Sequence, residues 1–183
     1  MRVICTERSQ VLGAHLAHVL QVPVVNVKFS RFPDGEHYLL AGDLDDETVI
    51  VGSVVDNDAL VQLLLLIDAC EPSRTQLVLP YMAYARQDKQ FKRGEPLSAR
   101  VVAKALSRGV SEIFTINIHD PGVLTHFAVP AQNLPDGFQI PAFFTLCRFN
   151  FSCCHLLCLL SPRYGTSFRR FPYSRAKLHL PPF

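Results

Sequence analysis

The chain has 183 residues and is 49% hydrophobic, which is enough for one ordinary core and a small appendage. Its formal net charge of only +2 gives no reason to expect nucleic acid or a membrane surface as a partner. We expect no signal peptide, since no long apolar stretch follows the first charged residues, and the apolar run at 60–69 is too short to cross a bilayer. These features predict a cytoplasmic protein.

The first half of the chain is predicted to alternate strands with helices. Short runs rich in β-branched residues are typical of strands, whereas apolar residues that recur every three or four positions indicate a helix. Ser9 stands at the N-cap position of the first helix, and the run from Leu60 to Ala69 is apolar almost all round, which predicts a buried helix. By these patterns the strands are residues 2–5, 22–29, 37–40 and 48–55, and the helices are residues 10–20 and 60–69.

The same alternation continues to residue 127. Strands are predicted at 76–79 and 112–118, and a short helix at 121–127. Between the two strands, Pro96 opens a helix that ends before Gly109, with one apolar face made of Val101, Val102, Ala105 and Leu106. This order predicts an α/β fold, a mostly parallel sheet with helices on both faces, whose ligands bind beyond the carboxyl ends of the strands.

A first polar segment, residues 31–36, surrounds a predicted tight turn at Gly35. Asp34 and Glu36 flank this glycine, and Phe32 precedes it. The segment suits a solvated turn between strands. The alternative, which the spacing alone does not favour, is a purine clamp in which the aromatic ring stacks on the base and the carboxylates accept hydrogen bonds from its amine.

Two further segments follow predicted strands. Residues 80–89 include Arg86, Gln87 and Lys89, which suit a polyphosphate because arginine offers a planar fork and lysine a mobile charge; a charged surface loop is the alternative. His119 follows the strand at 112–118 and could meet a divalent cation or a phosphate. The alternative is a surface histidine beside a turn that Asp120 caps. Because no P-loop pattern occurs in the chain, a nucleotide would need another cradle.

Taken together, the three segments resemble ribose-phosphate pyrophosphokinases in order and spacing. Residues 31–36 resemble the family's adenine-contacting loop, residues 84–89 with Gly94 and Pro96 are similar to its most distinctive stretch, and Ile118-His119 followed by Asn133 resembles its metal-binding signature. The resemblance covers about residues 1–134 and favours the compact archaeal branch.

The resemblance implies a phosphoribosyltransferase-like N-terminal domain in an enzyme that transfers diphosphate from ATP to ribose 5-phosphate. It implies Mg²⁺ as the cofactor and a cytoplasmic homo-oligomer, with neither nucleic acid nor a membrane as partner. His119 matches the metal-associated histidine, whereas Asn117 and Gln132 stand where many members have Asp. No catalytic residue is carried over. The residues carried over for ATP binding are Phe32, Asp34, Gly35, Glu36, Arg86 and Gln87.

The composition changes abruptly after residue 136. Residues 1–136 hold all 16 acidic residues and 12 of the 18 Lys and Arg residues, a net charge of −4, whereas residues 137–183 hold six basic and no acidic residues. Cys154 and Cys158 could be read as a pair of metal ligands, but the cysteines after residue 136 lack the two closely spaced pairs that are typical of zinc sites. We expect residues 1–136 to form the nucleotide-binding domain. Residues 137–183 read as an out-of-frame or poorly ordered tail, with a genuine apolar appendage as the alternative.

The composition of this tail bears on activity. Family members carry a second domain whose acidic, glycine- and threonine-containing loop grips ribose 5-phosphate, and residues 137–183 offer no acidic residue for such a loop. The chain is therefore expected to be truncated and inactive alone. The alternative is a non-catalytic subunit that binds nucleotide or associates with full-length relatives.

Overall fold

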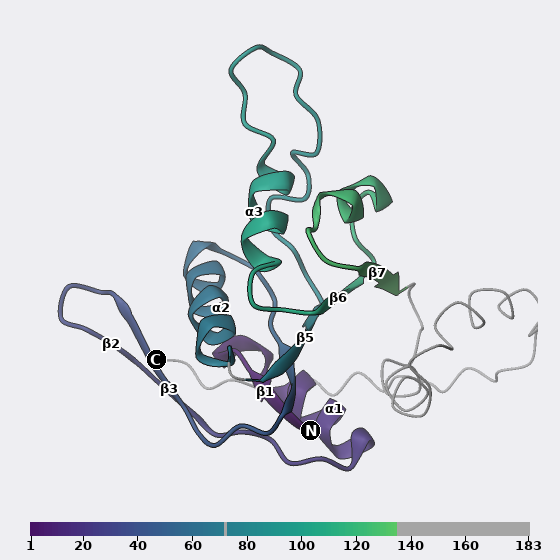
Figure 1. The fold of residues 1–183 in the computed structure, drawn as a ribbon. Helices are drawn as coiled ribbons and strands as arrows, with labels where there is room; N and C mark the ends of the chain where they lie inside the picture. The colour runs from purple at the N-terminus through teal and green to yellow at the C-terminus, as the bar shows by residue number, and fades with distance from the viewer. Residues whose placement is uncertain (72, 135–183) are drawn as a thin grey trace, which may run out of the picture. The chain divides into compact units, whose positions relative to one another are not determined.

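The computed structural model describes residues 1–71 and 73–134, all of which belong to one compact unit (Figure 1). The boundary predicted at residue 136 lies outside the described residues, as does everything expected of residues 137–183, including their cysteine pair. Within the described part, no helix is both long and apolar enough to cross a membrane.

A five-stranded sheet forms the centre of this unit. Every neighbouring pair of its strands is parallel, which confirms the predicted α/β fold. The last strand was not predicted, because its sequence Ala-Gln-Asn-Leu has neither the alternation nor the β-branched residues of a typical strand. In spatial order the strands are β1 (Arg2–Cys5), β4 (Glu47–Val51), β5 (Arg74–Leu79), β6 (Glu112–Ile116) and β7 (Ala131–Leu134).

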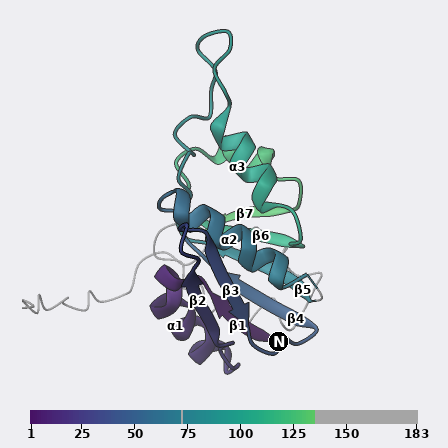
Figure 2. The ribbon, with the colours of Figure 1, turned by 90° about the vertical axis from the view of Figure 1, so that its left-hand side faces the viewer.

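Helices cover both faces of the sheet, as predicted. A short 3-10 helix, η1 (Glu7–Ser9), leads into α1 (Gln10–Leu20), which lies on one face, whereas α2 (Asn57–Ala69) and α3 (Ser98–Leu106) lie side by side on the other (Figures 1 and 2). Successive strand residues point to opposite faces. Ile4, Ile50 and Leu77 therefore join the core beneath α2 and α3, whereas Cys5 meets α1 at Gly13.

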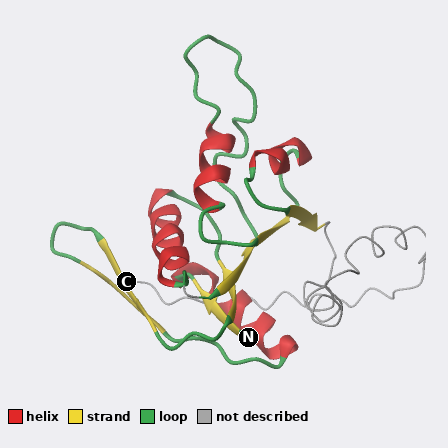
Figure 3. Ribbon diagram, in the orientation of Figure 1, coloured by secondary structure: helices red, strands yellow, loops and turns green. Residues whose placement is uncertain are grey.

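The strands β2 (Val27–Arg31) and β3 (His37–Ala41) form a separate antiparallel hairpin that packs on α2. Its turn points away from the five-stranded sheet (Figure 1). A second projection is the long loop of residues 80–97 between β5 and α3, which contains no helix or strand (Figure 3). These two projections carry two of the three polar segments.

Several predicted details were wrong. The helix α2 was predicted to be buried all round, but its Val61 is 46% exposed. Val101 was predicted on the buried face of α3, but it is 59% exposed. The buried face of α3 is instead Ala99, Val102, Ala103 and Leu106. The strand predicted at 22–29 begins only at Val27, and the helix predicted at 121–127 is a 3-10 helix, η2 (Pro121–His126).

Candidate functional site

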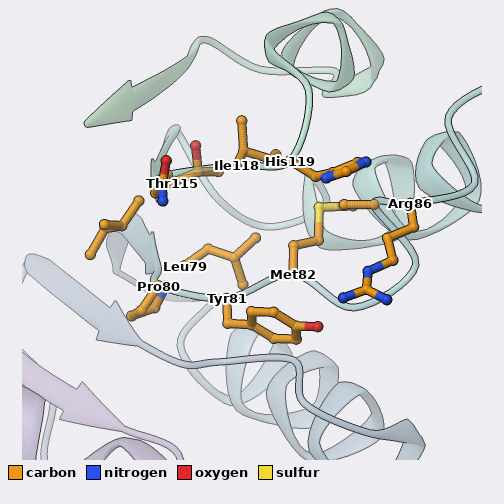
Figure 4. A pocket seen from close by; sticks show the side chains of 11 residues that line it. Leu79, Pro80, Tyr81, Met82, Arg86, Thr115, Ile118 and His119 are labelled. Atoms are coloured by element: carbon orange, nitrogen blue, oxygen red, sulfur yellow. The ribbon is translucent and has the colours of Figure 1, made fainter. Parts of the chain in front are cut away.

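A pocket of about 190 Å³ lies where β5 and β6 end. One wall comes from the last residue of β5 and from residues 80–82, 85 and 86 of the loop that follows it. The other wall comes from residues 115–119 at the end of β6 (Figure 4). Arg86 and His119 both line it, and their side chains lie at the same end of the pocket (Figure 4). The structure therefore brings together two of the predicted site residues at the carboxyl edge of the sheet.

The backbone before Arg86 is fixed by an extension of the sheet. The N–H of Val54 donates to the carbonyl of Tyr81 at 2.8 Å, and the N–H of Ala83 donates to the carbonyl of Val54 at 2.8 Å. Tyr84 then adopts a left-handed conformation with φ of 68°, and its hydroxyl donates to the side chain of Asn57 on α2. This sharp turn, stabilised from α2, directs the chain so that Arg86 returns to the pocket.

The turn that carries His119 is held by Asn133 of β7. The side-chain oxygen of Asn133 accepts hydrogen bonds from the N–H of Ile118 at 2.9 Å and from the hydroxyl of Thr115 at 3.0 Å. Between them, Asn117 is left-handed, with φ of 47°, and its N–H donates to the carbonyl of Leu134 at 3.0 Å. Such a conformation is uncommon outside glycine, and asparagine tolerates it best.

The pocket presents a cation that no described group neutralises. Within residues 1–71 and 73–134, the guanidinium of Arg86 has no ion pair and no hydrogen bond, and it is exposed to solvent. His119 is likewise exposed. The carboxylate of Asp120 does not pair with Arg86 or His119. It caps η2 by accepting a hydrogen bond from the N–H of Gly122 at 2.7 Å. This arrangement suits an anionic ligand.

The described side chains do not form a protein cage for a metal. No cluster of three or more His, Cys, Asp or Glu side chains occurs in the described part of the chain. Mg²⁺ typically keeps several waters and binds through substrate phosphates with few protein ligands. His119, the candidate ligand at the pocket, therefore suits a cation that is already coordinated by the phosphates of its ligand.

Gln87 was predicted beside Arg86 in the site, but it does not line the pocket. Its side-chain oxygen accepts from the hydroxyl of Ser98, and its carbonyl accepts from the N–H of Ala99 at 3.2 Å. Both contacts tie Gln87 to the start of α3. A role for Gln87 with a ligand stays a prediction.

Residues 32–36 form the turn of the β2–β3 hairpin, and none of them lines the pocket. Gly35 has φ of 94°, which confirms the predicted tight turn, and Glu36 donates its N–H to the carboxylate of Asp34 at 3.2 Å. The Phe32 ring is 49% exposed and meets Tyr38 edge to face, with 5.6 Å between ring centroids. The structure thus separates this turn from the pocket of its own chain.

The hairpin also contacts α2 through an ion pair that no sequence pattern indicates. Arg31 contacts the carboxylate of Asp58 with an N–O distance of 2.6 Å. The hydrogen bond and the positive charge of Arg31 lower the pKa of Asp58. The hydrogen bond between Ile118 and Asn133 was not predicted either, since Asn133 entered only through the family resemblance. Neither this bond nor the Arg31–Asp58 pair leaves a local sequence pattern, because the partners are 15 and 27 residues apart in the chain.

Comparison with known proteins gives consistent matches. The family described as the N-terminal domain of ribose phosphate pyrophosphokinase matches residues 1–109. A ribose-phosphate pyrophosphokinase of Methanosarcina mazei is 46% identical over 138 residues, which cover 73% of this chain and 46% of the relative. One from Methanopyrus kandleri is 38% identical over 140 residues, or 73% of this chain and 48% of the relative.

A solved structure agrees with these relatives. The crystal structure of phosphoribosylpyrophosphate synthetase from Mycobacterium smegmatis matches with a TM-score of 0.65 and 26% identity, covering 73% of this chain and 48% of that one. The chain therefore spans about half the length of the relatives it matches.

Proposed function

The chain belongs to the ribose-phosphate pyrophosphokinase family, and we propose that its described domain binds the ATP from which diphosphate is transferred to ribose 5-phosphate. One observation carries this proposal: Arg86 and His119, which are 33 residues apart, line a single pocket at the carboxyl edge of a parallel sheet. Ligands of such sheets bind at this edge.

The chemistry of the two side chains suits a triphosphate. Arg86 has a planar guanidinium that can donate two parallel hydrogen bonds to phosphate oxygens, and no described carboxylate competes for it. His119 offers an imidazole nitrogen at the same end of the pocket (Figure 4). The side chain of Asn133 accepts from the N–H of Ile118 and so fixes the backbone next to His119.

We propose that Mg²⁺ enters with the triphosphate and that, among the described residues, His119 is the one that coordinates it. Bound there, the cation would neutralise negative charge on the phosphate oxygens during transfer. Arg86 would hold the phosphate chain from the opposite wall. Gln87 would act on the nucleotide only after release from Ser98.

The β2–β3 turn is proposed to clamp an adenine in the pocket of a second copy. Phe32 would stack on the base, while Asp34 and Glu36 would accept hydrogen bonds from its amine. Since this turn does not line the pocket of its own chain, the proposal entails a homo-oligomer. Gly35 would let the backbone approach closely. The ATP requirement also supports a cytoplasmic location.

Calorimetric titration of the chain with Mg-ATP tests this function. Arg86→Gln should weaken binding about 10- to 100-fold, because a charge-assisted fork to phosphate is lost. Arg108→Gln is the matched control, since Arg108 lies between α3 and β6, at the edge of the sheet opposite the pocket. Equal affinities for the two variants, or no binding by the unmodified chain, would contradict the proposal.

His119→Ala gives a second, independent arm. Its effect should be seen with Mg-ATP and should disappear with ATP in EDTA, since His119 is proposed to act on the cation. An equal loss with and without Mg²⁺ would assign His119 to phosphate instead. The two titrations therefore separate metal contact from phosphate contact.

We propose further that the 183-residue chain binds nucleotide without completing the transfer. Residues 137–183 contain no acidic residue with which to hold ribose hydroxyls, and no Asp or Glu lines the described pocket. Incubation with Mg-ATP and ribose 5-phosphate should release no AMP. Release of AMP that depends on the sugar would contradict this, whereas binding without release favours a non-catalytic nucleotide-binding subunit.

A further inference from the structure

Arg31, the last residue of β2, contacts two different elements. Its Nη2 lies 2.6 Å from the carboxylate of Asp58 in the first turn of α2, and its Nη1 donates to the carbonyl of Gly35 at 3.0 Å. One planar guanidinium therefore joins the helix to the middle of the β2–β3 turn. Because the fork is rigid, fixing one of its sides restricts the other.

Asp58 also faces the other strand of the hairpin. Its second oxygen lies 3.8 Å from Nε2 of His37, the first residue of β3. The side chain of His37 is only 11% exposed, and its Nε2 has no hydrogen-bond partner within the described residues. A single carboxylate on α2 thus meets one residue from each strand, on either side of the turn.

The turn has few other restraints. Its hydrogen bonds are internal: Phe32 donates to Glu36, Gly35 to Phe32, and Glu36 to Asp34. All five residues from 32 to 36 are exposed. Within the described part of the chain, the contact of Arg31 with Asp58 is the ion pair that connects the base of this turn to the body of the domain.

From this geometry we propose that Asp58 is a positioning residue, which holds the Phe32–Glu36 turn in its ligand-ready conformation through Arg31. Asp58 itself touches no ligand. Its importance for nucleotide binding rests on the proposed function, in which this turn clamps the base. The positioning of the turn can be measured separately from that role.

Amide hydrogen exchange by NMR measures the turn directly. Asp58→Asn removes the charge but keeps the shape, so the Phe32 and Gly35 amides should exchange about 1.5- to 5-fold faster, the range expected for loss of an exposed ion pair. Amides of the core strands, such as those of Ile50 and Leu77, should not change. Since exposed pairs are screened by salt, 1 M NaCl should shrink the difference between the two proteins.

Two further variants separate positioning from general loss of structure. Asp58→Glu retains the carboxylate and should recover most of the protection in the turn. Asp68→Asn is the matched control, because Asp68 is an exposed aspartate at the other end of α2 with no side-chain partner among the described residues. Exchange in the turn that is the same in Asp58→Asn and Asp68→Asn overturns the proposal.

Mg-ATP titration of the same variants distinguishes this inference from the proposed function. Faster exchange together with weaker binding supports both. Faster exchange with unchanged affinity supports the positioning role of Asp58 and contradicts the role proposed for the turn. Unchanged exchange overturns the positioning role whatever the affinity is.

Discussion

Replacing Asn133 with alanine tests how the chain orients the turn that carries His119. The substitution removes the oxygen that accepts from the Ile118 N–H at 2.9 Å and from the Thr115 hydroxyl at 3.0 Å. The two donors are affected unequally. Thr115 has an alternative acceptor, the carbonyl of Gln132 at 3.3 Å, whereas the half-buried N–H of Ile118 has no other described acceptor.

The magnitude follows from this difference. A partly buried donor that loses its acceptor costs about 1–2 kcal/mol, and the hydroxyl adds only a few tenths because it can rotate to Gln132. We therefore expect Asn133→Ala to lower the free energy of unfolding by about 1–2 kcal/mol, or the melting temperature by roughly 3–8 °C. Asn133→Asp keeps an oxygen in place and should cost less than about 0.5 kcal/mol.

Urea unfolding followed by far-ultraviolet circular dichroism is the assay, because the chain has no tryptophan to report by fluorescence. Exchange of the Ile118 amide should accelerate in Asn133→Ala and not in Asn133→Asp. The reasoning is refuted if both variants unfold at the same urea concentration as the unmodified chain and the Ile118 amide keeps its protection.

Three other predictions concern the core and the N-terminus. A Cβ at Gly13 would lie 1.8 Å from Sγ of Cys5, so Gly13→Ala should cost about 1–3 kcal/mol in urea unfolding, and adding Cys5→Ala should recover part of it; a neutral Gly13→Ala would contradict this packing. The hydrogen bond and charge of Arg2, with those of the N-terminal amine, lower the pKa of Asp45. The contribution of the Asp45 carboxylate to folding stability is therefore complete above the unfolded pKa of about 3.9 and is lost as pH falls through the lower folded value. Asp45→Asn should accordingly lower stability at pH 7 and lower it progressively less in acid. An equal loss of stability at every pH would contradict this. Burial raises the pKa of Cys5 to about 11 and that of Cys70 to about 12, so mass mapping should find both unlabelled by iodoacetamide at pH 8 until urea unfolds the chain, and rapid native labelling would exclude such burial.

The periodicity of the sequence predicted most of the helices and strands, and its errors have physical causes. The pattern at 96–108 assigned Val101 to the buried face of a helix, but α3 buries Ala99, Val102, Ala103 and Leu106, a register that places Val101 on the outside. Ala99 and Ala103 complete the buried face with Val102 and Leu106, while Arg100 and Lys104 share the exposed side with Val101. The strand β7 was missed because it adds to a sheet edge through backbone pairing with β6, which depends little on its own side chains.

The candidate site divides in the same way. The sequence singled out Arg86 and His119 because their segments follow predicted strands and resemble those of a known family, and it predicted the tight turn at Gly35 from the glycine itself. It did not indicate Asp58, since an ion pair between residues 27 positions apart leaves no local pattern. Nor did it indicate that Gln87 bonds to Ser98 at the start of α3 and not to the pocket.

The amino-acid order by itself determined the alternation of strands and helices, the parallel sheet, and the residue types at its carboxyl edge. These features depend on the local periodicity of apolar residues and on the alternation of strands and helices along the chain. Only the tertiary structure decided which groups meet. Arg86 and His119 share a pocket because β5 and β6 are neighbours in the sheet, whereas the Phe32–Glu36 turn is separated because its hairpin packs on α2 and never joins that sheet.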